Sequence, residues 1–386
     1  MKRLCVRHLG PLEHGEVQFG DLTVLVGPQA TGKSLFLQLA KLLVDMVAIR
    51  QELRRFNIRW GNEAQDLFEV YFGEGMSALY SKDKTEVELD DKPVDWGHML
   101  QTRGRLPKSR APKMFYIPAQ RVITIRDGLT RPFTDYRAGD PFVVREFSEI
   151  LHQLVQTEFG GREELFPVKG RLKQQYRDLI EKHVFRGLKL QVDTERFQRR
   201  VVLQIPDKSV LPFLAWSSGQ REFVPLLLGL YWLLPPAKVP RRGALEWVVI
   251  EEPEMGLHPN AVSVVILLIL ELLQRGYRVC VSTHSTHVLD IVWALGVFQR
   301  YQSTEADVRA LFNLPASMSS WAREILAKQF AVFYFQPDGH VRDISALDPG
   351  APDMAEAGWG GLTELSANVS EIVGRVVARS AGNGAW

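Results

Sequence analysis

The eight residues Gly27-Pro28-Gln29-Ala30-Thr31-Gly32-Lys33-Ser34 constrain the fold of this chain more than any other segment. The apolar run Leu22–Val26 precedes them and is typical of a strand, and apolar residues at helical spacing follow from Ser34 to about Phe56. A glycine-rich turn between a strand and a helix can bind phosphate, because its backbone N–H groups and the positive helix end surround the anion. The pattern therefore predicts a phosphate-binding loop, or P-loop.

The P-loop also predicts the ligands of the site. Lys33 should reach the β- and γ-phosphates of a nucleotide, and the Ser34 hydroxyl should bind Mg²⁺. The expected cofactors are accordingly ATP and Mg²⁺. The loop residues that we expect to contact the nucleotide are Gly27, Ala30, Thr31, Gly32, Lys33 and Ser34.

An acidic strand, Val248-Val249-Ile250-Glu251-Glu252, lies far downstream. Four apolar residues, Trp247 to Ile250, lead into the two carboxylates, and this pattern is typical of a Walker B strand. Glu251 would hold Mg²⁺ through water, and Glu252 would orient or deprotonate the attacking water. Most P-loop ATPases have Asp at the first position, so Glu251 departs from the majority. The alternative is a charged strand end at the protein surface.

Two further polar residues are candidates for sensing the nucleotide. His284 follows the strand-like run Val279–Ser282, so it could reach the γ-phosphate from a neighbouring strand end. Gln120 lies where the core meets a helical lobe, and there it could sense the γ-phosphate or bind Mg²⁺. The alternatives are a structural histidine and an ordinary loop amide.

A second glycine-containing turn, Ser217-Ser218-Gly219-Gln220, lies between the P-loop and the acidic strand. The P-loop alone indicates only that a nucleotide binds. A second such turn at this place suggests a site that another copy of the chain completes. We therefore expect Ser217, Ser218, Gly219 and Gln220 to contact a nucleotide, and the chain to form a homodimer or a higher homo-oligomer.

The order of these motifs resembles that of the ABC-type ATPases. More narrowly, Ile250-Glu251-Glu252-Pro253-Glu254 with Leu257-His258-Pro259, followed by Ser282-Thr283-His284-Ser285, is similar to the OLD (overcoming lysogenization defect) and RecF-like branch. Walker B strands that begin with Glu are common in that branch. The resemblance covers residues 1–295.

The resemblance implies that two heads stack head to tail with ATP between one P-loop and the partner's signature turn. Ser217 and Gly219 would then contact the γ-phosphate across the interface, Glu252 would be the catalytic base, and His284 would be the switch histidine. The signature usually starts with Leu. Trp216 stands there in this chain, which leaves the packing under the turn open.

The alternation of strands and helices predicts an α/β fold, a P-loop NTPase of the ABC-ATPase type. We expect a mainly parallel core sheet, an antiparallel β subdomain with strands at Leu67–Phe72 and Glu86–Leu89, and an inserted helical lobe. The expected division is as follows: 1–120, core with P-loop and β subdomain; 121–216, helical lobe with strands; 217–300, core with signature, Walker B and His284; 301–386, helix, β-hairpin and acidic tail.

Composition adds the cellular setting. Apolar residues make up 46% and charged residues 24%, as in globular proteins, and the net charge of +2 argues neither for nor against nucleic acid. The two distant cysteines fit a reducing cytoplasm, and the N-terminus does not resemble a signal peptide. The apolar runs Phe223–Leu234 and Ala261–Leu270 are shorter than the roughly 20 residues that a spanning helix needs. We expect a cytoplasmic protein without membrane contact.

Absences guide the choice among ABC-type ATPases. Fewer than 100 residues separate Gln120 from Ser217, which is too few for a long coiled-coil arm, and the chain contains no Asp-x-Asp metal motif of a TOPRIM nuclease. We favour the ATPase subunit of an anti-phage defence system that controls a separate, nuclease-like effector. The alternatives are a RecF-like DNA repair and recombination ATPase and, from another class, an ABC transporter ATPase subunit.

Direct DNA contact is a further possibility that the charge pattern leaves open. Residues 101–113 carry five basic residues, and residues 171–200 carry nine basic and four acidic ones. These segments could form a DNA-facing stripe or solvated surfaces. Six acidic residues and no basic one lie in residues 343–374, a tail that could cover a basic patch of a partner or be solvated.

Overall fold

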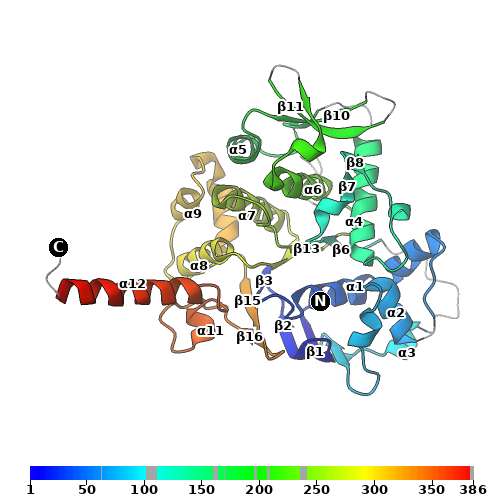
Figure 1. The fold of residues 1–386 in the computed structure, drawn as a ribbon, viewed down its shortest axis with the longest axis horizontal. Coiled ribbons are helices and arrows are strands. Elements are labelled where there is room, and N and C mark those ends of the chain that lie inside the picture. Colours follow the sequence, from blue (N-terminus) through cyan, green and yellow to red (C-terminus); the bar gives the residue numbers. More distant parts are fainter. Residues whose placement is uncertain are drawn as a thin grey trace.

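The fold is built around a six-stranded sheet of order β16-β15-β3-β14-β13-β6 (Figure 1). A computed structural model describes residues 1–61, 63–100, 111–159, 164–168, 170–194, 198–206, 209–234 and 241–382. All neighbouring strands of the sheet are parallel except β15 and β16. This confirms the mainly parallel core. The strands are β3 (Leu22–Val26), β6 (Met114–Ile117), β13 (Trp247–Glu251), β14 (Arg278–Ser282), β15 (Phe330–Phe335) and β16 (Val341–Asp343).

The central strands are apolar throughout because both faces of the sheet are buried. Val24 and Val248 face a core formed with the helices that follow the signature and Walker B motifs. The next residues, Leu25 and Val249, face a second core formed with the helix after the P-loop. The covering helices are α1 (Lys33–Arg55), α6 (Ser218–Leu233), α7 (Pro259–Gln274) and α8 (Thr286–Arg300). Because these strands run parallel, their carboxyl ends lie at the same edge of the sheet.

Helix α1 is kinked at Asp45, whose φ of −117° and ψ of 17° are not helical. The side chain of Asp45 accepts hydrogen bonds from the backbone N–H groups of Lys113 and Met114, where β6 begins. Lys41 Nζ lies 2.9 Å from Asp45 Oδ2 and 3.0 Å from Glu146 Oε2, and it is 1% exposed. Burial disfavours the ammonium, but the two carboxylates raise the pKa of Lys41. This buried network joins α1, β6 and the lobe.

A separate antiparallel sheet of order β2-β1-β4-β5 packs beside α1. Its strands are β1 (Arg3–Leu9), β2 (Leu12–Gln18), β4 (Glu86–Leu89) and β5 (Lys92–Pro93). The sequence prediction of a strand at Leu67–Phe72 is wrong, because this segment lies in helix α2 (Ala64–Tyr71). One side of that helix is buried in the second core, where Leu67, Phe68 and Tyr71 pack. The spacing of these three residues suits a helix better than a strand.

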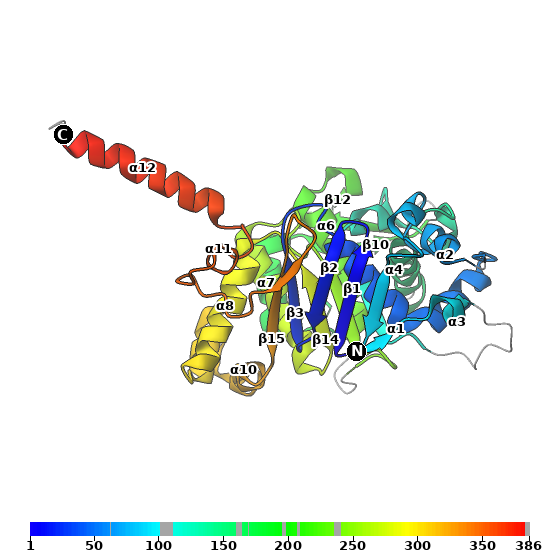
Figure 2. The same ribbon diagram turned by 90° about the horizontal axis from the view of Figure 1, so that it is seen from below.

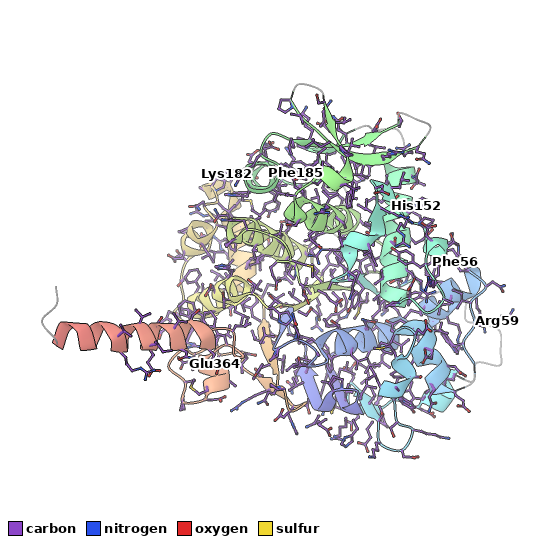
Figure 3. The ribbon with its side chains drawn as sticks, viewed as in Figure 1. Phe56, Arg59, His152, Lys182, Phe185 and Glu364 are labelled. Carbon is purple, nitrogen blue, oxygen red and sulfur yellow. The ribbon has the colours of Figure 1, made fainter. Side chains whose placement is uncertain are left out.

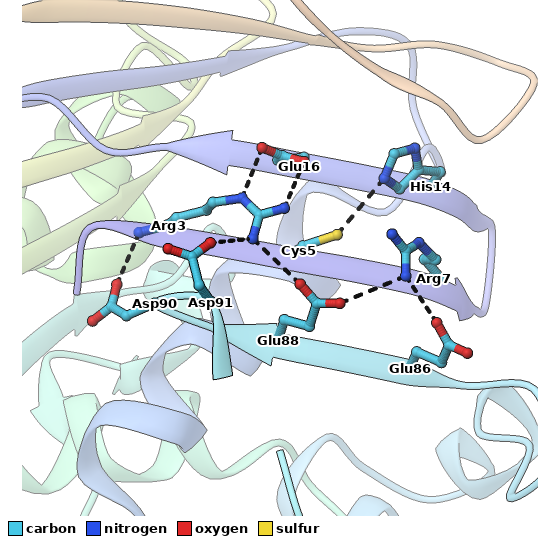
Figure 4. Close-up of polar contacts among 9 residues, drawn as sticks. All are labelled: Arg3, Cys5, Arg7, His14, Glu16, Glu86, Glu88, Asp90 and Asp91. Carbon is cyan, nitrogen blue, oxygen red and sulfur yellow. Dashed lines mark hydrogen bonds and ion pairs between the residues drawn. The ribbon is translucent and has the colours of Figure 1, made fainter. Parts of the chain in front are cut away.

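The outer face of this sheet is polar (Figure 4). Arg3 binds both carboxylate oxygens of Glu16, at 2.7 and 2.8 Å, and lies 2.7 Å from Asp91. Under these side chains Cys5 Sγ lies 3.7 Å from His14 Nε2, and burial raises the pKa of the Cys5 thiol. Cys5, His14 and Glu16 present ligand atoms within 4.8 Å of one another. Since Arg3 already neutralises Glu16, we interpret the cluster as an ion-pair network.

The lobe between Gln120 and the signature turn holds helices and a four-stranded antiparallel sheet of order β12-β11-β10-β9. Its strands β10 and β11 lie at the opposite end of the molecule from β1 (Figure 1). The lobe elements are η2 (Arg121–Thr124), β7 (Ile125–Arg126), β8 (Leu129–Thr130), η3 (Phe133–Asp135), α4 (Phe142–Gln153), η4 (Leu154–Glu158), β9 (Glu164–Phe166), α5 (Gln174–Ile180), η5 (Glu181–Phe185), β10 (Lys189–Asp193), β11 (Arg200–Gln204), β12 (Val210–Leu211) and η7 (Phe213–Ala215).

The C-terminal segment returns to the core through β15, which pairs with β3, the strand that leads to the P-loop. The predicted hairpin is thus part of the main sheet. Helix α12 (Glu364–Gly382) projects away from the body (Figure 2). In the described part of the chain no helix is long and apolar enough to cross a membrane. The remaining helices are η1 (Met76–Leu79), α3 (Trp96–Leu100), α9 (Glu305–Leu311), η8 (Ala316–Met318), α10 (Ser319–Leu326) and α11 (Met354–Ala357).

Candidate nucleotide site

The P-loop joins β3 to α1, as the sequence predicts. Lys33 Nζ donates to the backbone carbonyls of Gly27, at 2.8 Å, and Pro28, at 2.6 Å. Burial lowers the pKa of Lys33 to about 8, although the nearby carboxylates of Glu252 and Glu251 oppose the shift. An ammonium with a depressed pKa gains much from an anion, so this lysine is suited to a phosphate.

Glycine is required at two P-loop positions. Gly27 has φ of +140°, and a Cβ there would lie 2.3 Å from the Phe335 carbonyl oxygen of β15. Gly32 has φ of +93°, and a Cβ would lie 2.9 Å from Leu12 in the β1–β2 hairpin. The loop is therefore held between the main sheet and the antiparallel sheet, which fixes where its N–H groups can meet a ligand.

Glu251 ends β13 and is 1% exposed. Its Oε2 accepts a hydrogen bond of 3.1 Å from the Ala119 N–H, while its buried Oε1 has no hydrogen-bond partner among the described residues. Burial raises the pKa of Glu251, and the Ser34 hydroxyl is the first group that opposes the shift. A buried carboxylate oxygen without a partner, beside a hydroxyl, fits a hard divalent cation such as Mg²⁺. Ser34 and Glu251 would hold it.

Glu252 and His284 face each other from the ends of β13 and β14. His284 Nε2 lies 3.8 Å from Glu252 Oε1. Burial and the Lys33 ammonium lower the pKa of His284, which keeps its imidazole neutral near pH 7. Glu252 has φ of +43°, and its N–H donates to the Ser282 carbonyl at 2.8 Å. This left-handed turn directs the chain sharply away from the strand.

Glu254 holds the histidine segment in place. Its Oε1 accepts hydrogen bonds of 2.7 Å from both the Thr283 hydroxyl and the His284 backbone N–H. Burial raises the pKa of Glu254, and these two donors oppose the shift. In the sequence, Glu254 stands out only by its place in the motif Ile250-Glu251-Glu252-Pro253-Glu254. The sequence feature that could have indicated its role is a carboxylate two residues after the Glu251-Glu252 pair.

Gln120 lies on the loop that follows β6, next to the residue that binds Glu251. Its side chain is exposed, and Ala119 provides the contact with the Walker B carboxylate. The loop therefore lies at the Glu251 end of the site. The role of the Gln120 amide as a γ-phosphate sensor or a ligand of Mg²⁺ stays a prediction.

Sequence reasoning also missed Arg121, a buried residue that contacts the candidate site. It is 0% exposed, and its Nη1 and Nη2 donate to the backbone carbonyls of Glu251, at 2.8 Å, and Glu252, at 2.9 Å. Its Nε donates to the Glu222 carbonyl of α6 at 3.2 Å and lies 3.6 Å from a Glu222 carboxylate oxygen. One side chain thus connects the Walker B strand end to the signature helix. The only sequence signal was an arginine directly after Gln120.

The signature turn begins α6 with a capping box. The Gln220 N–H donates to Ser217 Oγ at 3.3 Å, and the Ser217 N–H donates to Gln220 Oε1 at 3.1 Å. Gly219 lies against the segment before α7, because a Cβ there would be 2.8 Å from the Gly256 carbonyl oxygen. Trp216 is buried, and its Nε1 donates to the Leu211 carbonyl at 3.0 Å. The packing under the turn is therefore filled by the tryptophan.

The expected site residues lie in two separate regions of the structure. Lys33, Glu251, Glu252 and His284 converge at the carboxyl ends of β3, β13 and β14, with the Gln120 loop beside them. Ser217 to Gln220 instead line a cavity of about 300 Å³ that contains no P-loop residue. The signature turn is thus connected to the Walker B strand through Arg121, while the cavity that it lines includes no P-loop residue among the described residues.

Comparisons with known proteins agree with this architecture. Residues 140–290 match the protein family described as "AAA domain, putative AbiEii toxin, Type IV TA system". None of the curated proteins matches the chain. The parallel strand order and the P-loop between β3 and α1 define an α/β P-loop NTPase fold.

Solved structures with some likeness to the chain include SMC heads and an ABC cassette. An SMC head bound to the C-winged helix domain of ScpA is 12% identical, with a TM-score of 0.42, over 75% of this chain and 90% of that chain. The SMC head domain from Thermotoga maritima is 12% identical, with a TM-score of 0.31, over 75% and 90%. A dimeric bacterial ABC transporter cassette is 10% identical, with a TM-score of 0.34, over 88% and 97%.

Proposed function

We propose that this protein is an ATPase of the ABC type that binds and hydrolyses ATP with Mg²⁺. The observation that carries the proposal is the convergence of Lys33, Glu251, Glu252 and His284 at one edge of the parallel sheet. A cation for the phosphates, a buried carboxylate with a free oxygen and a second carboxylate for water are the parts that phosphoryl transfer needs.

The chain's own residues would act as follows. The P-loop N–H groups and Lys33 bind the β- and γ-phosphates, and Mg²⁺ held by Ser34 and Glu251 would offset their charge. Glu252 accepts a proton from the attacking water while the new bond to the γ-phosphorus forms. The bond from the γ-phosphorus to the β–γ bridging oxygen breaks, and ADP leaves with that oxygen. Neutral His284, beside Glu252, donates a hydrogen bond to the γ-phosphate.

We also propose that the site is completed by a second copy of the chain. Ser217 and Gly219 lie in a cavity apart from the P-loop, so in one copy they leave its nucleotide open on one side. In a head-to-tail homodimer the signature turn of each copy would cover the nucleotide of the other. Each dimer would then hold two composite ATP sites, and higher homo-oligomers could form from such dimers.

The wider role that we propose is anti-phage defence, in which the ATPase controls a separate, nuclease-like effector. The support for this role is the description of the matched family, which names an AAA domain and a putative AbiEii toxin of a type IV TA system. Purification of the ATPase with the product of each neighbouring gene, in the presence of ATP, tests for that effector.

Direct DNA contact receives less support from the described residues than the charge pattern suggested. In residues 171–200, Arg171, Lys173 and Lys189 pair with carboxylates of Glu158, Glu271 and Glu164. The basic residues at 103, 105, 108 and 110 lie outside the described residues. A basic side chain held by a carboxylate of its own chain is less available for phosphate.

The test of hydrolysis is the substitution Glu252→Gln. We expect ATP binding to persist and hydrolysis to fall by about 100-fold or more, because the base is lost while the phosphate contacts stay. Steady-state ATPase rates and equilibrium ATP binding measure the two effects. Glu246→Gln, at a surface carboxylate paired with Lys113, is the matched control and should leave both unchanged. A Glu252→Gln protein with the wild-type rate would show that the base is another group.

A further inference from the structure

The cavity at the signature turn has a chemistry that the turn alone does not explain. Besides Ser217 to Gln220, it is lined by His183 and Arg186 of the lobe and by His258 at the start of α7. Its lining residues include no Asp or Glu. Lys182, Arg186 and His258 add to burial in lowering the pKa of His183, so the cavity carries a positive potential from several elements. Such a cavity favours an anion.

The position of Arg186 follows from its neighbours. Phe185, at the end of η5, is buried, and its ring lies 6.0 Å from that of Phe223 in α6 and 4.8 Å from that of Phe166 in β9 (Figure 3). This anchor fixes the end of η5 to the signature helix. The next residue, Arg186, has φ of +50° and ψ of +52°, and with Gly187 it turns the chain out of the helix.

The side chain of Arg186 is exposed, and no hydrogen bond or ion pair joins its guanidinium to another residue in the parts of the chain that the structure describes. Arg171 of the same lobe is by contrast buried, and its guanidinium pairs with Glu158. A left-handed conformation at a non-glycine residue costs free energy and concentrates at functional sites. Arg186 is therefore held beside the signature turn with its charge unneutralised.

We propose that Arg186 of one copy contacts the triphosphate of a nucleotide bound in the P-loop of a second copy. The proposal rests on the proposed function, because it needs the composite site of a dimer. The signature turn would present hydroxyl and N–H groups to the γ-phosphate. Arg186 would add a full positive charge, and its attraction to the phosphate oxygens would strengthen as negative charge moves onto them. A charge-assisted hydrogen bond from a guanidinium to phosphate supplies both energy and orientation.

The first experiment compares three variants in ATP binding and ATPase assays. Arg186→Gln removes the charge but keeps the length, and it should lower kcat by about ten-fold or more while ATP binding to the P-loop of an isolated chain changes little. Arg186→Lys keeps a charge and should retain more activity than Arg186→Gln. Lys189→Gln, at an exposed residue of the same lobe that neither lines the cavity nor is among the charges acting on His183, should match wild type.

The second experiment distinguishes a contact between copies from one within a copy. Lys33→Ala chains are mixed with Arg186→Gln chains. In a mixed dimer, one site then combines an intact P-loop, from the Arg186→Gln chain, with an intact Arg186, from the Lys33→Ala chain. Partial recovery of ATPase over the separate proteins is therefore expected. If Arg186 acted within its own copy, that site would still lack it and no recovery would occur.

A parallel mixture of Lys33→Ala with Ser217→Arg tests the composite site itself. Recovery there without recovery in the Arg186→Gln mixture would overturn the role of Arg186 and leave the dimer standing. No recovery in either mixture, with mixed dimers verified by mass, would overturn both proposals. Wild-type kcat for Arg186→Gln would also overturn the role of Arg186. A circular dichroism spectrum and melting temperature equal to wild type show that Arg186→Gln folds, and they make its kinetic loss meaningful.

Discussion

Arg121 Nη1 donates a 2.8 Å hydrogen bond to the backbone carbonyl of Glu251. The same guanidinium binds the carbonyl of Glu252, whose φ of +43° is unusual for a residue other than glycine. Its third contact is Glu222 on the signature helix. A displacement of the signature helix would thus be transmitted to the two Walker B residues through one rigid planar group.

Arg121→Lys tests this connection. A lysine cannot bind both carbonyls and Glu222 in the same fork, so we expect the free energy of unfolding to fall by about 2 kcal/mol. We also expect kcat to fall more than ATP affinity, because Glu252 loses its fixed orientation. Denaturant unfolding and ATPase kinetics give the two values. Arg126→Lys, at an exposed arginine of the same lobe, is the control. Unchanged kcat in a stably folded Arg121→Lys protein would contradict the connection.

The lowered pKa of Lys33 predicts that the protein takes up protons when ATP binds. Burial lowers its pKa to about 8, so near pH 8 in the free protein the ammonium is only partly formed. The triphosphate favours the charged form and raises this pKa again, so binding should take up about half a proton at pH 8 and almost none at pH 6. Calorimetric titration in buffers of different ionisation enthalpy measures the uptake.

The control for proton uptake is Lys33→Arg. A guanidinium stays charged throughout this pH range, so any ATP binding that remains should be free of the pH 8 uptake. Equal binding enthalpies for wild type in all buffers at pH 8 would show that Lys33 is fully protonated before ATP arrives.

The buried Lys41 network predicts a large stability effect. Lys41→Met should lower the free energy of unfolding by about 3 to 5 kcal/mol, because Asp45 and Glu146 would keep buried charges without their cation. Denaturant unfolding followed by circular dichroism measures the change. Arg323→Met breaks an exposed pair with Glu305 and should lower the free energy of unfolding far less, because water already screens that pair. Similar losses in the two variants would argue against the network.

The contact of Gly219 with the Gly256 carbonyl predicts that even a methyl group disturbs the signature turn. A Cβ would approach that oxygen to 2.8 Å, so Gly219→Ala should shift the start of α6 away from the segment before α7. We expect ATPase to fall by about ten-fold while ATP binding to the P-loop persists. Gly296→Ala, in α8 where nothing lies within 4 Å of the added methyl, should not reduce activity. Wild-type ATPase for Gly219→Ala would show that the turn tolerates the shift.

The local elements were largely predictable, and the exceptions have a physical cause. The helix after the P-loop, the acidic strand, the strand before His284 and the C-terminal hairpin are confirmed. The segment Leu67–Phe72 was predicted wrongly because a short apolar run suits a strand or a buried helix, and its packing against the second core decides for the helix. The roles of the site residues themselves stay predictions that the experiments above test.

Two relationships lay beyond any sequence pattern. The pairing of β15 with β3 puts the Phe335 carbonyl against Gly27, although more than three hundred residues separate them. Arg121 looks like an ordinary loop arginine until Glu251, Glu252 and Glu222 are brought around it. Neither contact repeats with the period of a helix or a strand, so neither leaves a signal along the chain.

The sequence by itself determined the P-loop, the Walker B strand, the signature turn and their order, because each depends on residues adjacent in the chain. Each of these motifs is defined by residues only a few positions apart. The P-loop has glycines at positive φ, the signature turn has a capping pair of Ser and Gln, and the Walker B strand is an apolar run that ends in carboxylates. Only the tertiary structure decided that Lys33, Glu251 and His284 converge, that Arg121 links them to the signature helix, and that Arg186 lines the signature cavity. These contacts depend on which strands pair and which helices cover the sheet. Strand pairing and helix packing are in turn determined by the burial of the whole core.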